Sequence, residues 1–110
     1  IIVNLGGDNI SPSKIENMLC LNEKIKQSFV YGDKKTYLVA LVVSETEENK
    51  KEIENFLENL NKSLSLIEKV KKFKLIKEEF TIENGMLTPT LKLKRKKILE
   101  KYKQDLEKLY

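Results

Sequence analysis

The feature that most constrains the fold is one apolar run, Tyr37-Leu-Val-Ala-Leu-Val-Val43. It is far shorter than the roughly 20 residues that span a bilayer, and its length is that of a β-strand. Apolar residues occupy nearly every position of the run rather than every second one. This pattern predicts a central strand that is covered on both faces, so we expect a compact domain built around residues 37–44.

Periodicity and turn signals predict the elements around this strand. Residues 27–31 are expected to form a partner strand, and residues 32–35 a turn that joins the two strands as a hairpin. Ser11 and Pro12 suit the N-cap and the first position of a helix. The remaining expected elements are strands at residues 1–4 and 73–78, helices at residues 12–21, 47–65 and 93–109, and a short helical piece through Leu66, Ile67 and Val70. This order predicts an α+β domain with a small mixed sheet of about three main strands flanked by helices.

Composition limits the chemistry that one domain of 110 residues can perform. There are 21 Lys and Arg against 17 Asp and Glu, and Arg95 is the only Arg. Because bidentate recognition of bases and phosphates draws on Arg, a surface of Lys and Glu is more typical of a solvated face. The absence of His, with one Cys, excludes the usual zinc sites and any internal disulfide. We interpret Cys20 as a buried thiol in an apolar helix, in a reducing cytoplasm.

A turn, a stiff Thr-Pro-Thr segment and a basic cluster stand before the last helix, in Asn84-Gly-Met-Leu-Thr-Pro-Thr-Leu-Lys-Leu-Lys-Arg95. We expect a lysine in this segment to lie on an exposed loop, where its charge can interact with an anion. Basic runs are usually solvated surface, so the residues alone favour a lysine that merely opens a helix.

This segment resembles the last motif of the long-chain fatty acid–CoA ligases, a branch of the adenylate-forming enzymes. A second match, Ile2-Val-Asn-Leu-Gly-Gly-Asp-Asn-Ile-Ser-Pro-Ser-Lys-Ile-Glu16, resembles the family segment that follows the inter-domain hinge. The resemblance covers essentially the whole chain and implies that residues 1–110 are one mobile C-terminal domain. The opening at Ile1, without Met, agrees with a piece of a longer protein. Its large N-terminal adenylation domain would then be the partner, and the piece alone would be inactive.

The resemblance implies a reaction in two halves. A fatty acid attacks the α-phosphate of ATP, with Mg²⁺, to give an acyl-adenylate and pyrophosphate. The small domain then swings, and coenzyme A attacks the adenylate to give the thioester and AMP. Lys92 matches the lysine that acts in the first half. Leu91 stands where most relatives have Gly, which we interpret as a feature of the long-chain branch. Lys94, two residues on, is the rival for this role.

Other residues are assigned to ligands by the same resemblance. Gly6, Gly7 and Asn9 match the segment that approaches the pantetheine arm of coenzyme A, since Gly lets a backbone come close to a ligand. A tight turn before the Ser11 cap explains the same residues nearly as well. Arg95 is a candidate for contact with nucleotide phosphates or with acidic groups of the large domain, and surface charge is its simpler explanation. No metal ligands are expected in this chain.

Two other functions stay open at this stage. A pI of about 9.1 and the basic residues 92–97 suggest a small nucleic-acid-binding module, but the aromatic residues are spaced as core residues. The basic final helix suggests a membrane-surface adaptor, yet it alternates Lys with acids and lacks a Trp- and Phe-rich face. We therefore expect a cytoplasmic ligase domain with no nucleic-acid partner, in a parent that associates peripherally with membranes at most.

Overall fold

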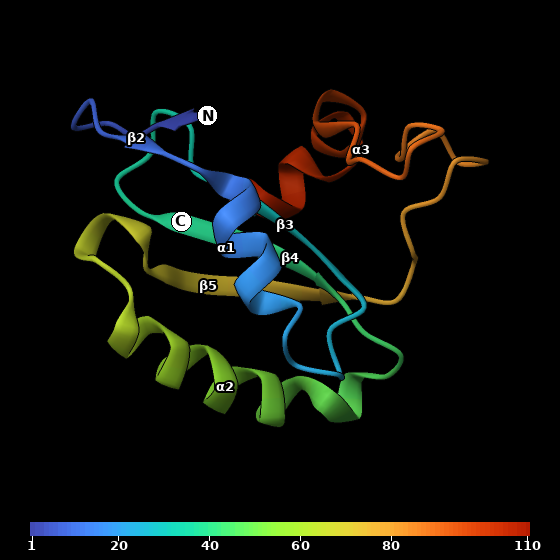
Figure 1. Cartoon of the computed structure of the whole chain (residues 1–110), viewed down its shortest axis with the longest axis horizontal. Coiled ribbons are helices and arrows are strands. Elements are labelled where there is room, and N and C mark those ends of the chain that lie inside the picture. Colours follow the sequence, from blue (N-terminus) through green and yellow to red (C-terminus); the bar gives the residue numbers. More distant parts are fainter.

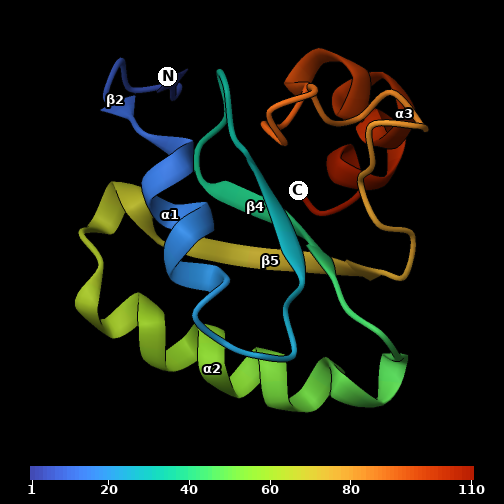
Figure 2. The ribbon, with the colours of Figure 1, turned by 45° about the vertical axis from the view of Figure 1, so that its right-hand side comes forward.

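The computed structural model describes the whole chain, residues 1–110, and shows three layers (Figures 1 and 2). The middle layer is a mixed sheet with the strand order β3-β4-β5, formed by β3 (Gln27–Tyr31), β4 (Leu38–Val43) and β5 (Val70–Ile76). Strand β4 pairs antiparallel with β3 and parallel with β5. Helices α1 (Pro12–Leu19) and α2 (Lys50–Ser63) cover one face, and α3 (Arg95–Glu107) covers the other. The predicted α+β architecture is confirmed.

Strand β4 is buried on both faces, as its sequence predicted. Leu38, Ala40 and Val42 join the core cluster that includes residues of α1 and α2. Val39, Leu41 and Val43 join the second cluster, which includes residues of α3 and of the segment before it. The alternation follows from the period of two in a strand, which sends successive side chains to opposite faces.

The predicted helices are present with small shifts at their ends. Ser11 caps α1, and the side chains of Ile98, Tyr102 and Leu106 form the buried stripe of α3. Short 3₁₀ turns, η1 (Glu47–Asn49) and η2 (Leu66–Glu68), lie on either side of α2. No helix in the structure is both long enough and apolar enough to cross a membrane.

Two expectations were wrong at element ends. Cys20 is exposed, because α1 ends at Leu19 and Cys20 forms its C-cap. With 3.6 residues per turn, Cys20 lies about 140° around the helix from Ile15, away from the buried stripe. Val70 belongs to β5 and not to a helical piece, because it pairs with Leu38 of β4 and its side chain packs in the core cluster under α1 and α2. The helical piece, η2, is therefore only three residues long.

A small hairpin precedes α1 and had been expected only in part. Strand β1 (Ile2–Val3) pairs with β2 (Asn9–Ile10), whose two residues carry no strand periodicity of their own. The hairpin is attached to the turn between β3 and β4: the Leu5 N–H donates to the Lys35 carbonyl at 2.9 Å, and the Lys34 N–H donates to the Val3 carbonyl at 2.8 Å. The N-terminal turn is thereby held against the β3–β4 turn.

The side chains near the C-terminus fasten α3 to the same β3–β4 hairpin. The Tyr110 hydroxyl donates to the Tyr37 carbonyl at 2.9 Å, and the Tyr37 hydroxyl donates to the Leu109 carbonyl at 3.1 Å. Glu107 accepts hydrogen bonds from the Lys35 ammonium and the Tyr31 hydroxyl. The hydrogen bond from Lys35, its positive charge and the Tyr31 hydroxyl together hold the pKa of Glu107 below its ordinary value.

Removing side-chain volume from the middle of β4 is expected to destabilise the domain. Leu41 is fully buried, so Leu41→Ala leaves a cavity and should lower the free energy of unfolding by about 2–5 kcal/mol. Leu66, which is 76% exposed, is the matched control, and Leu66→Ala should change stability by less than about 0.5 kcal/mol. Urea titrations of the two variants test this, and equal losses would contradict the two-sided burial of β4.

The ion pair at Glu107 is expected to make stability depend on acid pH. Because the folded-state pKa is lowered, the stabilisation is complete above the ordinary value of 4.5 and is lost as the pH falls through the folded value. Glu107→Gln should therefore be less stable than the parent at pH 7 and lose less stability on acidification. Thermal melts between pH 7 and pH 3 measure both slopes; parallel curves would show that Glu107 does not contribute.

Candidate functional site

The segment that carries Lys92 is a hydrogen-bonded loop, residues 86–94, which we call the Lys92 loop. Leu87 and Leu93 form an antiparallel bridge, and the Lys94 N–H donates to the Met86 carbonyl at 2.8 Å. At the tip, the Thr88 N–H donates to the Lys92 carbonyl at 2.8 Å, and the Lys92 N–H donates to the Thr88 hydroxyl at 3.1 Å. Met86 and Leu87 are buried in the core beside α3. The backbone at Lys92 is thus fixed on both sides.

The side chain of Lys92 is free on this fixed backbone. It is exposed and makes no ion pair within the domain. Lys94 is likewise exposed and unpaired, but its residue is the N-cap of α3. Only Lys92 lines the neighbouring groove. The structure thus separates two lysines that stand two residues apart in the sequence.

This groove, the Lys92 groove, lies at the β3 edge of the sheet, where the α1 layer meets the Lys92 loop. It has a volume of about 570 Å³. Its lining comes from α1 (Ser13, Glu16, Asn17 and the capping Cys20), from residues 26–28 around the start of β3, and from the loop and α3 (Leu87, Leu91, Lys92, Leu93 and Arg95). Apolar and basic side chains therefore stand side by side in one open hollow.

Arg95 is engaged inside the domain by Glu16. Its guanidinium donates to both Glu16 carboxylate oxygens, at 2.6 and 2.8 Å, and to the Ser13 hydroxyl at 3.4 Å. The same carboxylate accepts the Val30 N–H at 2.8 Å, and the guanidinium lies 5.9 Å from the centre of the Phe29 ring. The carboxylate thus satisfies a backbone donor at the sheet edge and ties the start of α3 to α1. Contact of Arg95 with phosphates or with a large domain stays a prediction.

Glu16 is the residue of this site that the sequence expectations missed. Its side chain is only 8% exposed, and it lies on the buried stripe of α1 with Pro12, Ile15 and Leu19. This spacing was visible in the sequence, because positions i, i+3, i+4 and i+7 share one helix face. A carboxylate on such a face needs a cationic partner, but nothing local identifies which basic residue supplies it.

Leu91 has an unusual backbone conformation. Its φ is +64°, in the left-handed region that costs a non-glycine residue about 1–2 kcal/mol. A glycine would adopt this conformation without strain. The Leu91 N–H donates to the Thr88 carbonyl at 2.8 Å, so Thr88 holds the backbone of Leu91 as well as that of Lys92. We call these hydrogen bonds the Thr88 clamp.

Gly6, Gly7 and Asn9 lie in the β1–β2 hairpin, at a different place on the surface from the Lys92 loop (Figures 1 and 2). Gly7 has a φ of +86°, and a Cβ there would meet no atom within 4 Å. The turn is closed by Asn4, whose side-chain oxygen accepts the Asp8 N–H at 2.8 Å. The backbone at Gly7 is thus open to approach from outside, and the ligand role of the three residues stays a prediction.

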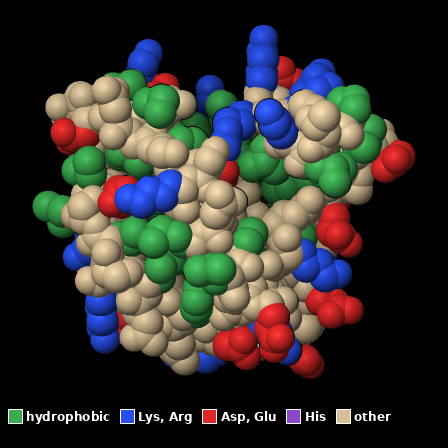
Figure 3. All heavy atoms as spheres, viewed as in Figure 1, with side chains coloured by type: hydrophobic (Ala, Val, Ile, Leu, Met, Phe, Trp, Pro, Cys, Tyr) green, Lys and Arg blue, Asp and Glu red, His purple; other side chains and the backbone are tan.

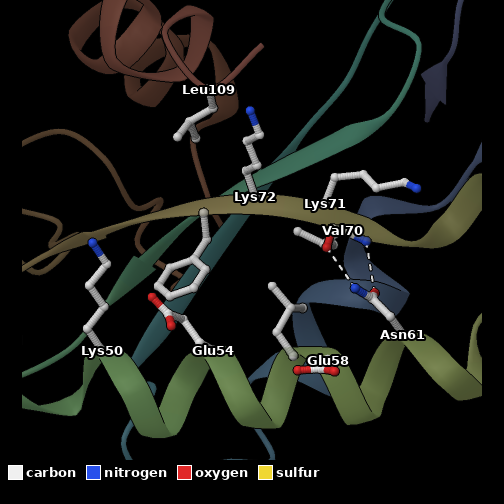
Figure 4. A pocket seen from close by; sticks show the side chains of 10 residues that line it. Lys50, Glu54, Glu58, Asn61, Val70, Lys71, Lys72 and Leu109 are labelled. Carbon is white, nitrogen blue, oxygen red and sulfur yellow. Dashed lines mark hydrogen bonds between the residues drawn. The ribbon is translucent and has the colours of Figure 1, made fainter.

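A second hollow lies between α2 and β5, on other elements than the Lys92 groove. Lys50, Glu54 and Asn61 rise from α2 toward the strand (Figure 4). Asn61 pairs with the edge of the sheet, since its amide donates to the Val70 carbonyl at 2.8 Å and accepts the Val70 N–H at 3.0 Å. No three carboxylate, His or Cys side chains come together in a way that could hold a metal ion.

Comparison with known proteins decides the family. The family model of the AMP-binding enzyme C-terminal domain matches residues 1–110. The chain belongs to this family. The curated relatives include the long-chain-fatty-acid–CoA ligase FadD15 of Mycobacterium tuberculosis, 32% identical over all of this chain and 22% of that protein. Long-chain-fatty-acid–CoA ligase 6 of Rattus norvegicus is 34% identical over 94% of this chain and 18% of that protein. The chain thus spans about a fifth of the length of these relatives.

Solved structures agree with this assignment. The adenylation domain of a carboxylate reductase from Mycobacterium chelonae superposes with a TM-score of 0.86, at 30% identity over 99% of this chain and 19% of that one. The A-PCP didomain of a carboxylic acid reductase from Segniliparus rugosus, solved with AMP, has a TM-score of 0.82 at 29% identity, over 96% of this chain and 16% of that one. The resemblance of the sequence to adenylate-forming enzymes is confirmed at the level of family and fold.

The Glu16–Arg95 pair is expected to contribute to the stability of this C-terminal domain. Arg95→Ala leaves a buried carboxylate without its cation and should cost about 2 kcal/mol, less than a fully buried pair because Arg95 is 38% exposed. Adding Glu16→Gln should restore part of the loss, since the amide still accepts the Val30 N–H. Denaturant titrations test both, with Lys94→Ala as the neutral control, and additive losses in the double variant would contradict the pairing.

Proposed function

We propose that this chain is the mobile C-terminal domain of a long-chain fatty acid–CoA ligase, and that Lys92 stabilises the adenylation step. The observation that carries the proposal is a free ammonium on a fixed loop, in a chain that belongs to the AMP-binding enzyme C-terminal domain family. In the parent protein this domain would close over a large adenylation domain that binds the fatty acid and ATP.

The only property of Lys92 that the adenylation step requires is its positive charge. As the fatty-acid carboxylate attacks the α-phosphorus of ATP, negative charge gathers on the oxygens between them before pyrophosphate leaves. An ammonium brought close to these oxygens lowers the energy of that charge, and it accepts or donates no proton in the step. Because the backbone of Lys92 is clamped while its side chain is unpaired, the charge can be delivered and withdrawn with the whole domain.

The second half-reaction would use the β1–β2 hairpin. The sulfur of coenzyme A attacks the acyl carbon of the adenylate, and AMP leaves. We assign the open backbone at Gly7, together with Gly6 and Asn9, to the approach of the pantetheine arm. Their separation from Lys92 on the surface supports a domain that presents one face for each half. Since no residues here fit a metal ion, no step of the proposal uses Mg²⁺ held by this chain.

The nucleic-acid alternative finds no support in the geometry. All eight aromatic side chains are buried or half-buried, so none offers an open face on which bases could stack. The face in Figure 3 carries acidic as well as basic side chains, so its lysines form no unbroken basic patch.

Separate measurement of the two half-reactions in the full-length protein tests the role of Lys92. In Lys92→Ala, fatty-acid-dependent ATP–pyrophosphate exchange should fall by about 10²–10³-fold, the effect typical of losing one electrostatic stabiliser. Conversion of supplied acyl-adenylate to thioester should stay within about twofold of the parent, because the ammonium serves only the first half.

Lys94→Ala is the matched control, since Lys94 is equally exposed and unpaired but lies outside the groove. It should leave both half-reactions unchanged. If exchange survives in Lys92→Ala and collapses in Lys94→Ala, the roles of the two lysines are exchanged. If neither variant affects exchange, the electrostatic proposal is wrong.

A further inference from the structure

Leu91 combines two unfavourable features at one position. Its side chain is 67% exposed, and its φ is +64°. Lys34 is the only other non-glycine residue with a positive φ, and its side chain is polar. The conformation of Leu91 is held by hydrogen bonds on both sides, from its own N–H to the Thr88 carbonyl and between Lys92 and Thr88. The fold therefore exposes an apolar side chain to solvent on a backbone that is held by hydrogen bonds.

Leu91 faces the same hollow as Lys92. Both side chains line the Lys92 groove, together with Leu87 and Leu93, which are buried and half-buried. Three leucines therefore border the groove with the Lys92 ammonium, which makes no ion pair, whereas the Lys26 and Arg95 side chains at the groove are paired with acids. A cation next to an apolar strip complements an amphiphile, whose carboxylate is joined directly to a hydrocarbon chain.

We propose that Leu91 is a substrate-contacting residue, which packs against the first methylene groups of the fatty acid while Lys92 neutralises its carboxylate. This inference rests on the proposed function of Lys92. Leu91 and Lys92 are consecutive and line the same groove, so a fatty acid whose carboxylate meets the Lys92 ammonium can place its acyl chain against Leu91. Among the substrate groups near that carboxylate, the ribose and the phosphates are polar, whereas the acyl chain offers apolar surface for Leu91 to cover.

Two substitutions in the full-length protein remove the apolar contact in different ways. Leu91→Asn keeps a side chain of similar length that tolerates the left-handed conformation, but makes it polar. Leu91→Gly removes the side chain and relieves the backbone. In both, the KM for fatty acid in ATP–pyrophosphate exchange should rise about tenfold, as expected when a few methylene groups lose an apolar contact. The kcat, the KM for ATP and thioester formation from supplied acyl-adenylate should stay within about twofold.

Leu91→Met is the matched control, since it preserves apolar volume and should keep the KM for fatty acid within about twofold of the parent. Thermal melts of each variant verify that the domain is folded. An unchanged KM for fatty acid in Leu91→Gly and Leu91→Asn would overturn the proposal, as would an equal loss in thioester formation, which would mark Leu91 as a general docking contact. Failure of the Lys92 proposal is seen separately, as undiminished exchange in Lys92→Ala.

Discussion

Strand β4 is buried along its whole length, and both helical layers depend on it. Side chains of even number point toward α1 and α2, while those of odd number point toward α3 and the Lys92 loop. Residues of β3 and β5 add to both clusters, but only β4 is buried at every position. The loop that carries the candidate lysine is therefore placed by the same strand that organises the opposite face of the domain.

The two layers are joined a second time at the β3 edge, by Glu16. Its carboxylate accepts the Val30 N–H, which would otherwise be an open donor of an edge strand, and it binds the guanidinium that begins α3. A buried carboxylate is costly unless it is paired and hydrogen-bonded, and here it is both. The pair thus ties α1 to the start of α3, and both of its residues line the Lys92 groove.

Much of this fold could be predicted from local patterns in the sequence. The β3–β4 hairpin, α2 and the stripe of α3 were predictable because burial there follows a period of 2 or 3.6 within one segment. Strand β2 was not, since two residues pair only through the turn at Gly7. Nor could the partner of Glu16 be found, because Arg95 lies 79 residues away and is one of 21 basic residues. The resemblance to the family motif made Lys92 a candidate, whereas no pattern in the sequence predicted the left-handed backbone of Leu91 beside it.

A hydrogen-bonded Lys92 loop lowers the entropy cost of placing the ammonium in the proposed reaction. A lysine side chain loses up to about 2 kcal/mol of rotamer entropy when it is ordered, and a disordered backbone would add about 1–2 kcal/mol for each residue. The Thr88 clamp removes the backbone part before any substrate arrives, so only the side chain must be ordered on closure. Strain at Leu91 offsets part of this gain, and it is tolerated because core contacts of Met86 and Leu87 hold the base of the loop. Such a loop can move with the domain as one body, carrying its charge into the site and out again.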